Sequence, residues 1–313
     1  MNINTMRDQD HNTAEMKYFW DLPLLIHLAA LLGKILPRKA GLWLAGVIGS
    51  KIGKNKDNPM VNAIRANQWV IHQGSLSPDE LDALPQIIFT SAAKCMFDYF
   101  YFISRPVKLH NVVDFSPEVK IAFERIRNNQ PCVFVCPHLS NFDLMGYVLT
   151  LNGLDVQVLS FPNPTGAYKM QNQLRENLGI NVTPMGLTAF RQARKRLKEG
   201  GSILTGLDRP LEGNLREKYQ PEFFGHTSHL PVTYVRMAKE ANVPVMVIAA
   251  TSQPGGRYQL EGSDLIWMDE AEDLETEIIH NAQKVLRQAE PLIRKFSQQW
   301  AMFYPIWPQF LGK

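Results

Sequence analysis

One histidine of this sequence stands where a catalytic base is expected. His138 follows the apolar run Cys132-Val-Phe-Val-Cys136, which predicts a buried strand, and a helical pattern begins near Phe142. In open α/β sheets, ligands bind at the carboxyl ends of the strands, which is where His138 would lie. Because an imidazole can accept a proton near neutral pH, we predict that His138 is a general base.

A carboxylate follows this histidine five residues later. Asp143 comes after the turn from strand to helix, and this spacing would let it reach back to the second ring nitrogen of His138. A carboxylate there fixes the tautomer of the ring and stabilises the imidazolium. The spacing alone is a weak pattern in a chain with 8 histidines and 30 acidic residues. Together with the position at a strand end, it predicts a catalytic His138–Asp143 dyad.

Other common catalytic patterns are missing from the sequence. There is no Gly-x-Ser-x-Gly elbow of a serine hydrolase, no His-Glu-x-x-His zinc motif and no Walker phosphate loop. His226 and His229 lie three residues apart without a third ligand nearby in the sequence, so we do not read them as a metal site. We therefore expect neither a metal nor a cofactor.

Short apolar strands alternate with helical patterns after residue 130, which predicts an α/β domain with a mostly parallel central sheet flanked by helices. A long helical region, 59–103, precedes them. We predict strands near 132–136, 156–160, 180–183, 202–205 and 245–250, with an edge strand at 255–261. The predicted helices are near 142–151, 166–178, 187–199, 232–240 and 270–300.

The N-terminal segment contains two short apolar runs, residues 22–33 and 41–49, separated by Lys34, Pro37, Arg38 and Lys39. Neither run reaches the roughly 20 residues needed to span a bilayer. One interpretation is an interfacial helical hairpin with its apolar face in lipid; the other is a pair of helices packed on the main domain. We take 1–56 as a membrane-associating helical segment and 57–313 as the α/β domain. The polar first 15 or so residues do not resemble a secretory signal.

Composition narrows the function further. The 313 residues are 45% hydrophobic and 20% charged, as in folded globular proteins, and the net charge of +3 is too small to indicate a nucleic-acid partner. Cys95, Cys132 and Cys136 have no metal-type spacing, and the last two lie in the predicted strand, so we expect reduced cysteines in the core. The basic stretch 191–198 is typical of a solvated helix face, and contact with anionic lipid or an acidic acyl carrier protein is the alternative.

The order and spacing of several short motifs resemble the glycerolipid acyltransferase superfamily, whose first motif is His-x-x-x-x-Asp. The chain is most similar to the branch with the bacterial late lipid A and lysophospholipid acyltransferases and the mycobacterial phosphatidylinositol mannoside acyltransferases. The resemblance covers roughly residues 20–310. It rests on His138-Leu-Ser-Asn-Phe-Asp143, Asn172 and Arg175 before Leu178-Gly179, Gly206-Leu-Asp-Arg-Pro210, Phe223-Phe-Gly225, Leu230-Pro231 and Gln299-Trp-Ala-Met-Phe-Tyr-Pro-Ile-Trp307.

This resemblance implies an O-acyltransferase. His138 would deprotonate an acceptor hydroxyl, which attacks an acyl thioester of acyl carrier protein or coenzyme A, and no acyl-enzyme forms. The acceptor would be a membrane glycolipid or lysophospholipid, and the protein would bind the cytoplasmic face of the membrane as a peripheral or monotopic protein. Two alternatives remain open: a hydrolase of the thioesterase or lipase type, and a lipid-binding protein without catalysis.

The resemblance also implies substrate-binding residues. Asn172 and Arg175 on a predicted helix could bind a phosphate, although an exposed helix face would also explain them. Asp208 and Arg209 end a strand and would lie beside His138 in a parallel sheet, either as a functional site or as a structural ion pair; they match the family's second acidic site only loosely. The segment Phe223-Phe224-Gly225 could shape an acyl groove or simply form a packed loop.

Overall fold

The computed structural model describes residues 23–162, 164, 166–211 and 218–312. The polar N-terminal stretch and the start of the first apolar run lie outside the described residues. The helices are α1 Pro23–Ile35, α2 Arg38–Gly53, α3 Pro59–Ile71, α4 Pro78–Ile103, α5 Pro106–His110, α6 Pro117–Arg127, α7 Phe142–Leu151, α8 Gly166–Asn177, α9 Leu187–Lys198, α10 Thr233–Ala241 and α11 Leu274–Lys295. The strands are β1 Val113–Phe115, β2 Val133–Cys136, β3 Val156–Ser160, β4 Asn181–Pro184, β5 Ser202–Gly206, β6 Glu222–Phe223, β7 His226–Thr227, β8 Val245–Gln253 and β9 Arg257–Gly262.

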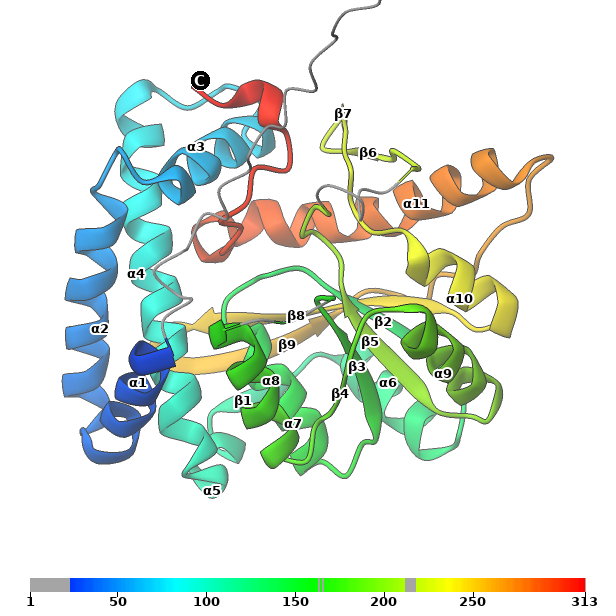
Figure 1. Cartoon of the computed structure of the whole chain (residues 1–313), viewed down its shortest axis with the longest axis horizontal. Helices are drawn as coiled ribbons and strands as arrows, with labels where there is room; N and C mark the ends of the chain where they lie inside the picture. Colours follow the sequence, from blue (N-terminus) through cyan, green and yellow to red (C-terminus); the bar gives the residue numbers. More distant parts are fainter. Residues whose placement is uncertain (1–22, 163, 165, 212–217, 313) are drawn as a thin grey trace, which may run out of the picture.

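A mostly parallel sheet forms the centre of the molecule (Figure 1). Within the described residues its order is β1-β9-β8-β2-β5-β3-β4, and β8 with β9 is the one antiparallel pair. The predicted α/β class is therefore confirmed. The strand expected at the edge, β9, lies between β8 and the three-residue strand β1, which is too short to show a hydrophobic pattern in the sequence.

Both faces of the sheet are buried, and alternate residues of β2 contribute to two separate cores. Val133 and Val135 pack with α9, α10, α11 and the C-terminal aromatic residues. Phe134 and Cys136 point to the opposite face and pack with α4, α6 and α7. A strand that is buried on both faces consists of consecutive apolar residues, and this pattern allowed β2 to be predicted from the sequence.

The adjacent strands β2 and β5 set the geometry of the site. They pair in parallel, with Cys136 opposite Gly206. His138 and Asp208 each lie two residues beyond this pair, so they stand next to each other at the carboxyl ends of the two strands.

The N-terminal helices pack on α4. Helices α1 and α2 both contact α4, and α2 lies along it (Figure 1). Gly41, Gly49 and Gly53 are the buried residues of α2, and a Cβ atom at Gly49 would lie 2.4 Å from the carbonyl oxygen of Phe89. The glycines therefore let the two helix backbones approach closely. One face of this segment is thus packed on the main domain. No helix among the described residues is both long and apolar enough to cross a bilayer.

Two glycines of α2 provide a matched test of this packing. Gly49→Ala should destabilise the protein by about 1–3 kcal/mol, because the new methyl group would overlap the α4 backbone. Gly46→Ala should be neutral or stabilising, because its Cβ would meet the flexible end of Lys94 at 3.0 Å and the Thr90 methyl group at an ordinary contact distance of 3.8 Å, and alanine is the better helix former. Thermal melts of both variants measure the difference. Equal melting temperatures would contradict the close packing of α2 on α4.

Candidate active site

His138 pairs with Asp208. Nδ1 of His138 lies 2.6 Å from Oδ1 of Asp208, and the backbone N–H of His138 donates to Oδ2 of the same carboxylate at 3.0 Å. Asp208 is completely buried, whereas 22% of the His138 side chain is exposed. No described residue hydrogen-bonds to the other ring nitrogen, Nε2. The arrangement is that of a general base with a buried carboxylate behind it.

Trp300 holds the far side of this carboxylate. Its indole N–H donates to Oδ2 of Asp208 at 2.7 Å, and Trp300 itself is buried. Asp208 thus accepts from the His138 backbone and from Trp300 while it faces Nδ1 of the imidazole. These donors fix the carboxylate and leave Oδ1 facing Nδ1, so Asp208 is placed to orient the ring and to stabilise an imidazolium.

The backbone around His138 is fixed by the C-terminal segment. The N–H of Ala301 donates to the carbonyl of His138 at 2.9 Å, and the N–H of Ser140 donates to the carbonyl of Gln299 at 2.8 Å. The side chain of Gln299 in turn bonds both backbone groups of Ser252 on β8. Ser140 has a φ of 48°, which is uncommon for a residue other than glycine and needs such support.

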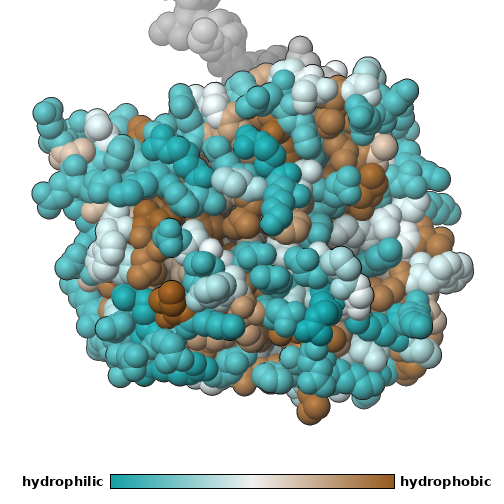
Figure 2. Space-filling model, turned by 180° about the vertical axis from the view of Figure 1, so that it is seen from behind, coloured by the Kyte–Doolittle hydropathy of each residue, from teal (hydrophilic) through white to brown (hydrophobic). Residues whose placement is uncertain are grey.

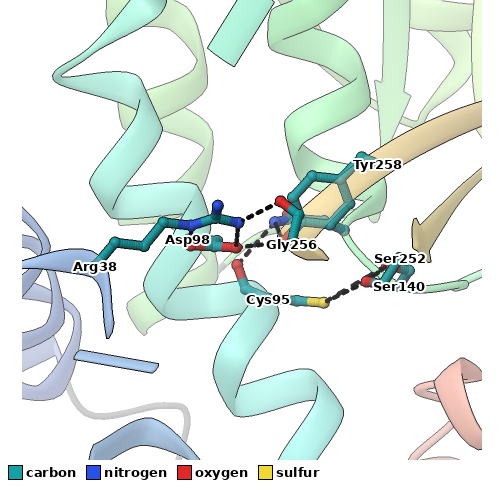
Figure 3. A network of polar contacts seen from close by, with 8 residues as sticks. Arg38, Cys95, Asp98, Ser140, Ser252, Gly256 and Tyr258 are labelled. Carbon is teal, nitrogen blue, oxygen red and sulfur yellow. Dashed lines mark hydrogen bonds and ion pairs between the residues drawn. The ribbon is translucent and has the colours of Figure 1, made fainter. Parts of the chain in front are cut away.

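A buried polar network connects this loop to the N-terminal helices (Figure 3). Arg38 of α2 forms a two-pronged ion pair with Asp98 of α4, and the Tyr258 hydroxyl donates to the same carboxylate at 2.7 Å. The Asn141 amide donates to the backbone carbonyl of Cys95 at 2.9 Å and lies 3.4 Å from the Tyr258 hydroxyl. The hydrogen bond to Asp98 raises the pKa of Arg38, so its guanidinium stays charged.

Cys95 and two serines complete this network beside the His138 loop. The Ser140 and Ser252 hydroxyls lie 2.6 Å apart, and the Cys95 thiol is 3.6 Å from Ser140 (Figure 3). Burial raises the pKa of the Cys95 thiol to about 11, so it is protonated near neutral pH and a poor nucleophile. All three cysteines are free and buried, as the sequence predicted.

The structure differs from the sequence prediction for Asp143. Its carboxylate is bound by Arg175 and by the Gln171 amide, the latter at 2.8 Å, and both partners lie on α8. The carboxylate at Nδ1 of His138 is that of Asp208. The physical reason is that β5 lies beside β2 in register, whereas Asp143 sits in the first turn of α7 and meets α8.

Asn172 and Arg175 belong to this second cluster. Arg175 donates to Asn172 at 2.8 Å, and Asn172 donates to the Ser160 hydroxyl at 3.0 Å. Burial by itself would lower the pKa of Arg175, but the charges of Asp143 and Tyr168 and the hydrogen bonds to them together outweigh burial and raise the pKa overall. With its guanidinium paired and 8% of the residue exposed, Arg175 braces α7 against α8. The exposed helix face considered as an alternative is not what the structure shows.

Arg209 lies between aromatic rings next to Asp208. Its guanidinium carbon is 3.9 Å from the ring centre of Phe161 and 4.2 Å from that of Tyr304. No ion pair of Arg209 with a described residue is present. The two residues Asp208 and Arg209 therefore do not pair with each other. The structural ion pair considered from the sequence is absent among the described residues, where the Arg209 guanidinium contacts aromatic rings instead.

Phe223, Phe224 and Gly225 form a packed hairpin away from the contacts of His138. Phe224 and Gly225 connect β6 to β7 with φ angles of 51° and 76°, the two positive values of a two-residue hairpin turn. The ring of Phe223 stacks on Trp307 at 5.7 Å. The packed-loop alternative accounts for all three residues.

Among the described residues, no cluster of histidine, cysteine and acidic side chains could hold a metal ion.

The sequence matches one known protein family. The family model of the bacterial lipid A biosynthesis acyltransferases matches residues 14–309. The chain belongs to this family. Membership implies that the protein is an acyltransferase of the lipid A biosynthesis type. A search of curated proteins finds no matching sequence.

Two site residues of this acyltransferase had no role assigned to them from the sequence. Trp300 and Gln299 lie more than 160 residues after His138. The sequence shows the motif that contains them but not that they contact the loop and the partner of His138. The pairing of His138 with Asp208 could have been predicted from a pattern in the sequence. Both residues follow an apolar strand, and they stand two positions beyond residues that face each other if the strands are neighbours.

Proposed function

We propose that the protein transfers a fatty acyl group from a thioester to a hydroxyl of a membrane glycolipid or lysophospholipid. The donor is acyl carrier protein or coenzyme A carrying the acyl chain. The observation that carries this proposal is the His138–Asp208 pair at the carboxyl ends of β2 and β5. His138 takes the proton of the acceptor hydroxyl through Nε2, and the resulting alkoxide attacks the thioester carbonyl. Asp208 holds the ring and stabilises the imidazolium, which then protonates the leaving thiolate.

Transfer occurs directly, without an acyl-enzyme. A covalent route needs a serine, threonine or cysteine within hydrogen-bond reach of the base. No such side chain among the described residues bonds to the ring of His138, and the nearby Ser140 hydroxyl bonds to Ser252 and Cys95. Arg209, held between Phe161 and Tyr304, attracts a phosphate of the donor or acceptor.

The protein acts at the cytoplasmic face of the membrane as a peripheral or monotopic protein. Large apolar side chains are exposed on the outer faces of α1 and α2, and soluble proteins rarely expose such a group of neighbours. They are Leu28, Leu31, Ile35, Trp43, Val47 and Ile48. The opposite face of α2 packs on α4, so one face of this helix contacts the domain and the other is free to contact the membrane.

An assay with purified protein tests this function. Acyl carrier protein or coenzyme A bearing a radiolabelled acyl chain is mixed with a detergent-solubilised lysophospholipid or glycolipid acceptor. We expect labelled acylated lipid that depends on the acceptor, with little free fatty acid. Release of free fatty acid at the same rate with and without acceptor would identify a hydrolase instead. Absence of both products with every donor and acceptor would contradict catalysis by this chain.

A further inference from the structure

A groove between α2 and α4 lies outside the candidate active site. It has a volume of about 730 Å³ and is lined by residues of both helices. Gly46 leaves room at its centre, where a Cβ would lie 3.0 Å from Cε of Lys94 and 3.8 Å from the Thr90 methyl group. The Gln86 amide donates to the Ser50 hydroxyl at 2.9 Å along the groove and ties the two helices together. None of the residues that line the groove contacts His138 or Asp208.

Three lysines line this groove. Lys51, Lys54 and Lys94 are all exposed, and within the described residues none of them forms an ion pair. Nearby Lys56, which does not line the groove, pairs with Asp82 at 2.7 Å. No acidic residue lines the groove. A site with three ammonium groups and no carboxylate is complementary to an anionic ligand.

The groove is also apolar along one wall. Trp43 and Val47 belong to its lining and are exposed by 70% and 49%. They continue into the exposed apolar side chains of α1 and α2, and α2 lies at the outer edge of the molecule (Figure 1). The opposite view shows a mostly hydrophilic surface interrupted by apolar patches, some of them toward the side where α1, α2 and α4 lie (Figure 2). Tryptophan beside lysine is typical of the headgroup region of a bilayer.

From these observations we propose that the groove between α2 and α4 binds the anionic headgroup of a membrane phospholipid, with Lys51, Lys54 and Lys94 on the phosphate and Trp43 and Val47 at the acyl–headgroup boundary. This lipid is a docking ligand, separate from the acyl acceptor. The inference rests on the membrane association in the proposed function and adds the class of lipid and its site. An acidic protein would match the lysines, but it would not account for the exposed apolar wall beside them.

The network of Figure 3 gives this site a fixed position relative to the catalytic loop. Arg38 at the start of α2 is bound to Asp98, and Asp98 is bound to Tyr258. Because α2 is held both by these contacts and by its glycines, a headgroup in the groove would orient the whole catalytic domain on the membrane.

Binding of the full-length protein to vesicles tests the proposal. Co-sedimentation is measured with vesicles of phosphatidylcholine alone and of phosphatidylcholine mixed with phosphatidylglycerol. Each lysine near an anionic surface contributes about fivefold in binding, so the variant with Lys51, Lys54 and Lys94 all changed to glutamine should bind the mixed vesicles on the order of 10²-fold more weakly. Its binding to phosphatidylcholine alone should stay unchanged. Trp43→Ala should weaken binding to both kinds of vesicle.

A control variant removes the same charge elsewhere. Lys120 on α6 and Lys195 and Lys198 on α9 are exposed and lie across the molecule from α2 (Figure 1). Their change to glutamine should alter binding to the mixed vesicles by no more than a few fold. Equal losses in the two triple variants would overturn the proposal, because binding would then depend on net charge and not on the groove.

A second measurement separates this proposal from the proposed function. Acyl transfer in detergent, without vesicles, should be the same in the wild type and in the groove variant. If the groove variant loses transfer from acyl carrier protein in detergent but keeps vesicle binding, the groove binds the acidic carrier and the proposal is wrong. If vesicle binding depends on the groove lysines but the wild type transfers no acyl group, the lipid site stands and the proposed function falls.

Discussion

Replacement of His138 by alanine should lower the rate of acyl transfer by about 10²–10⁴-fold, the usual share of a general base. The ring of His138 is the one partly exposed member of the His138–Asp208 pair, and its removal leaves no described group at that position to take the proton of the acceptor. The measurement is the initial rate of acylated lipid formation at saturating donor and acceptor.

A second variant shows that the loss is chemical and not structural. In His138→Asn the side-chain amide can still donate to Asp208, which keeps the buried carboxylate hydrogen-bonded, but it cannot accept a proton. We expect His138→Asn to melt close to the wild type and both variants to lose activity. Near-wild-type turnover in a folded His138→Ala protein would rule out the proposed mechanism.

Changing Asp208 to asparagine should lower the rate on the order of 10³-fold or more, because an amide cannot stabilise the imidazolium and would favour the wrong tautomer of His138. Asp143→Asn should act differently. Its carboxylate is the charged partner of the buried Arg175, and leaving that cation unpaired should cost about 3–5 kcal/mol of stability. We therefore expect Asp208→Asn to lose mainly activity and Asp143→Asn to lose mainly stability.

The two variants form a matched pair, since each replaces one carboxylate by its amide. Thermal melts and transfer rates, measured below the melting temperature of the weaker variant, give both quantities for each protein. If Asp143→Asn lost activity at full stability while Asp208→Asn kept its rate, Asp143 would be the partner of His138 during catalysis, as the spacing in the sequence predicted.

Local sequence patterns determined the elements and the position of His138. The apolar run before His138 gives a strand because all its residues are buried, and the predicted bounds 142–151 and 156–160 agree with α7 and β3. The position of His138 at a strand end also follows from neighbours in the chain. These features depend on interactions within about ten residues, so the sequence carries them directly.

The partners of those elements depended on tertiary structure. Asp208 lies beside His138 because a crossover connection places β5 next to β2. Trp300 reaches Asp208 because α11, which precedes it, runs over one face of the sheet. Spacing along the chain favoured Asp143 instead, because a local pattern cannot show that Arg175 competes for that carboxylate. In the same way, two short apolar runs predicted helices, but only the fit of Gly49 against the α4 backbone decided that α2 packs on the domain.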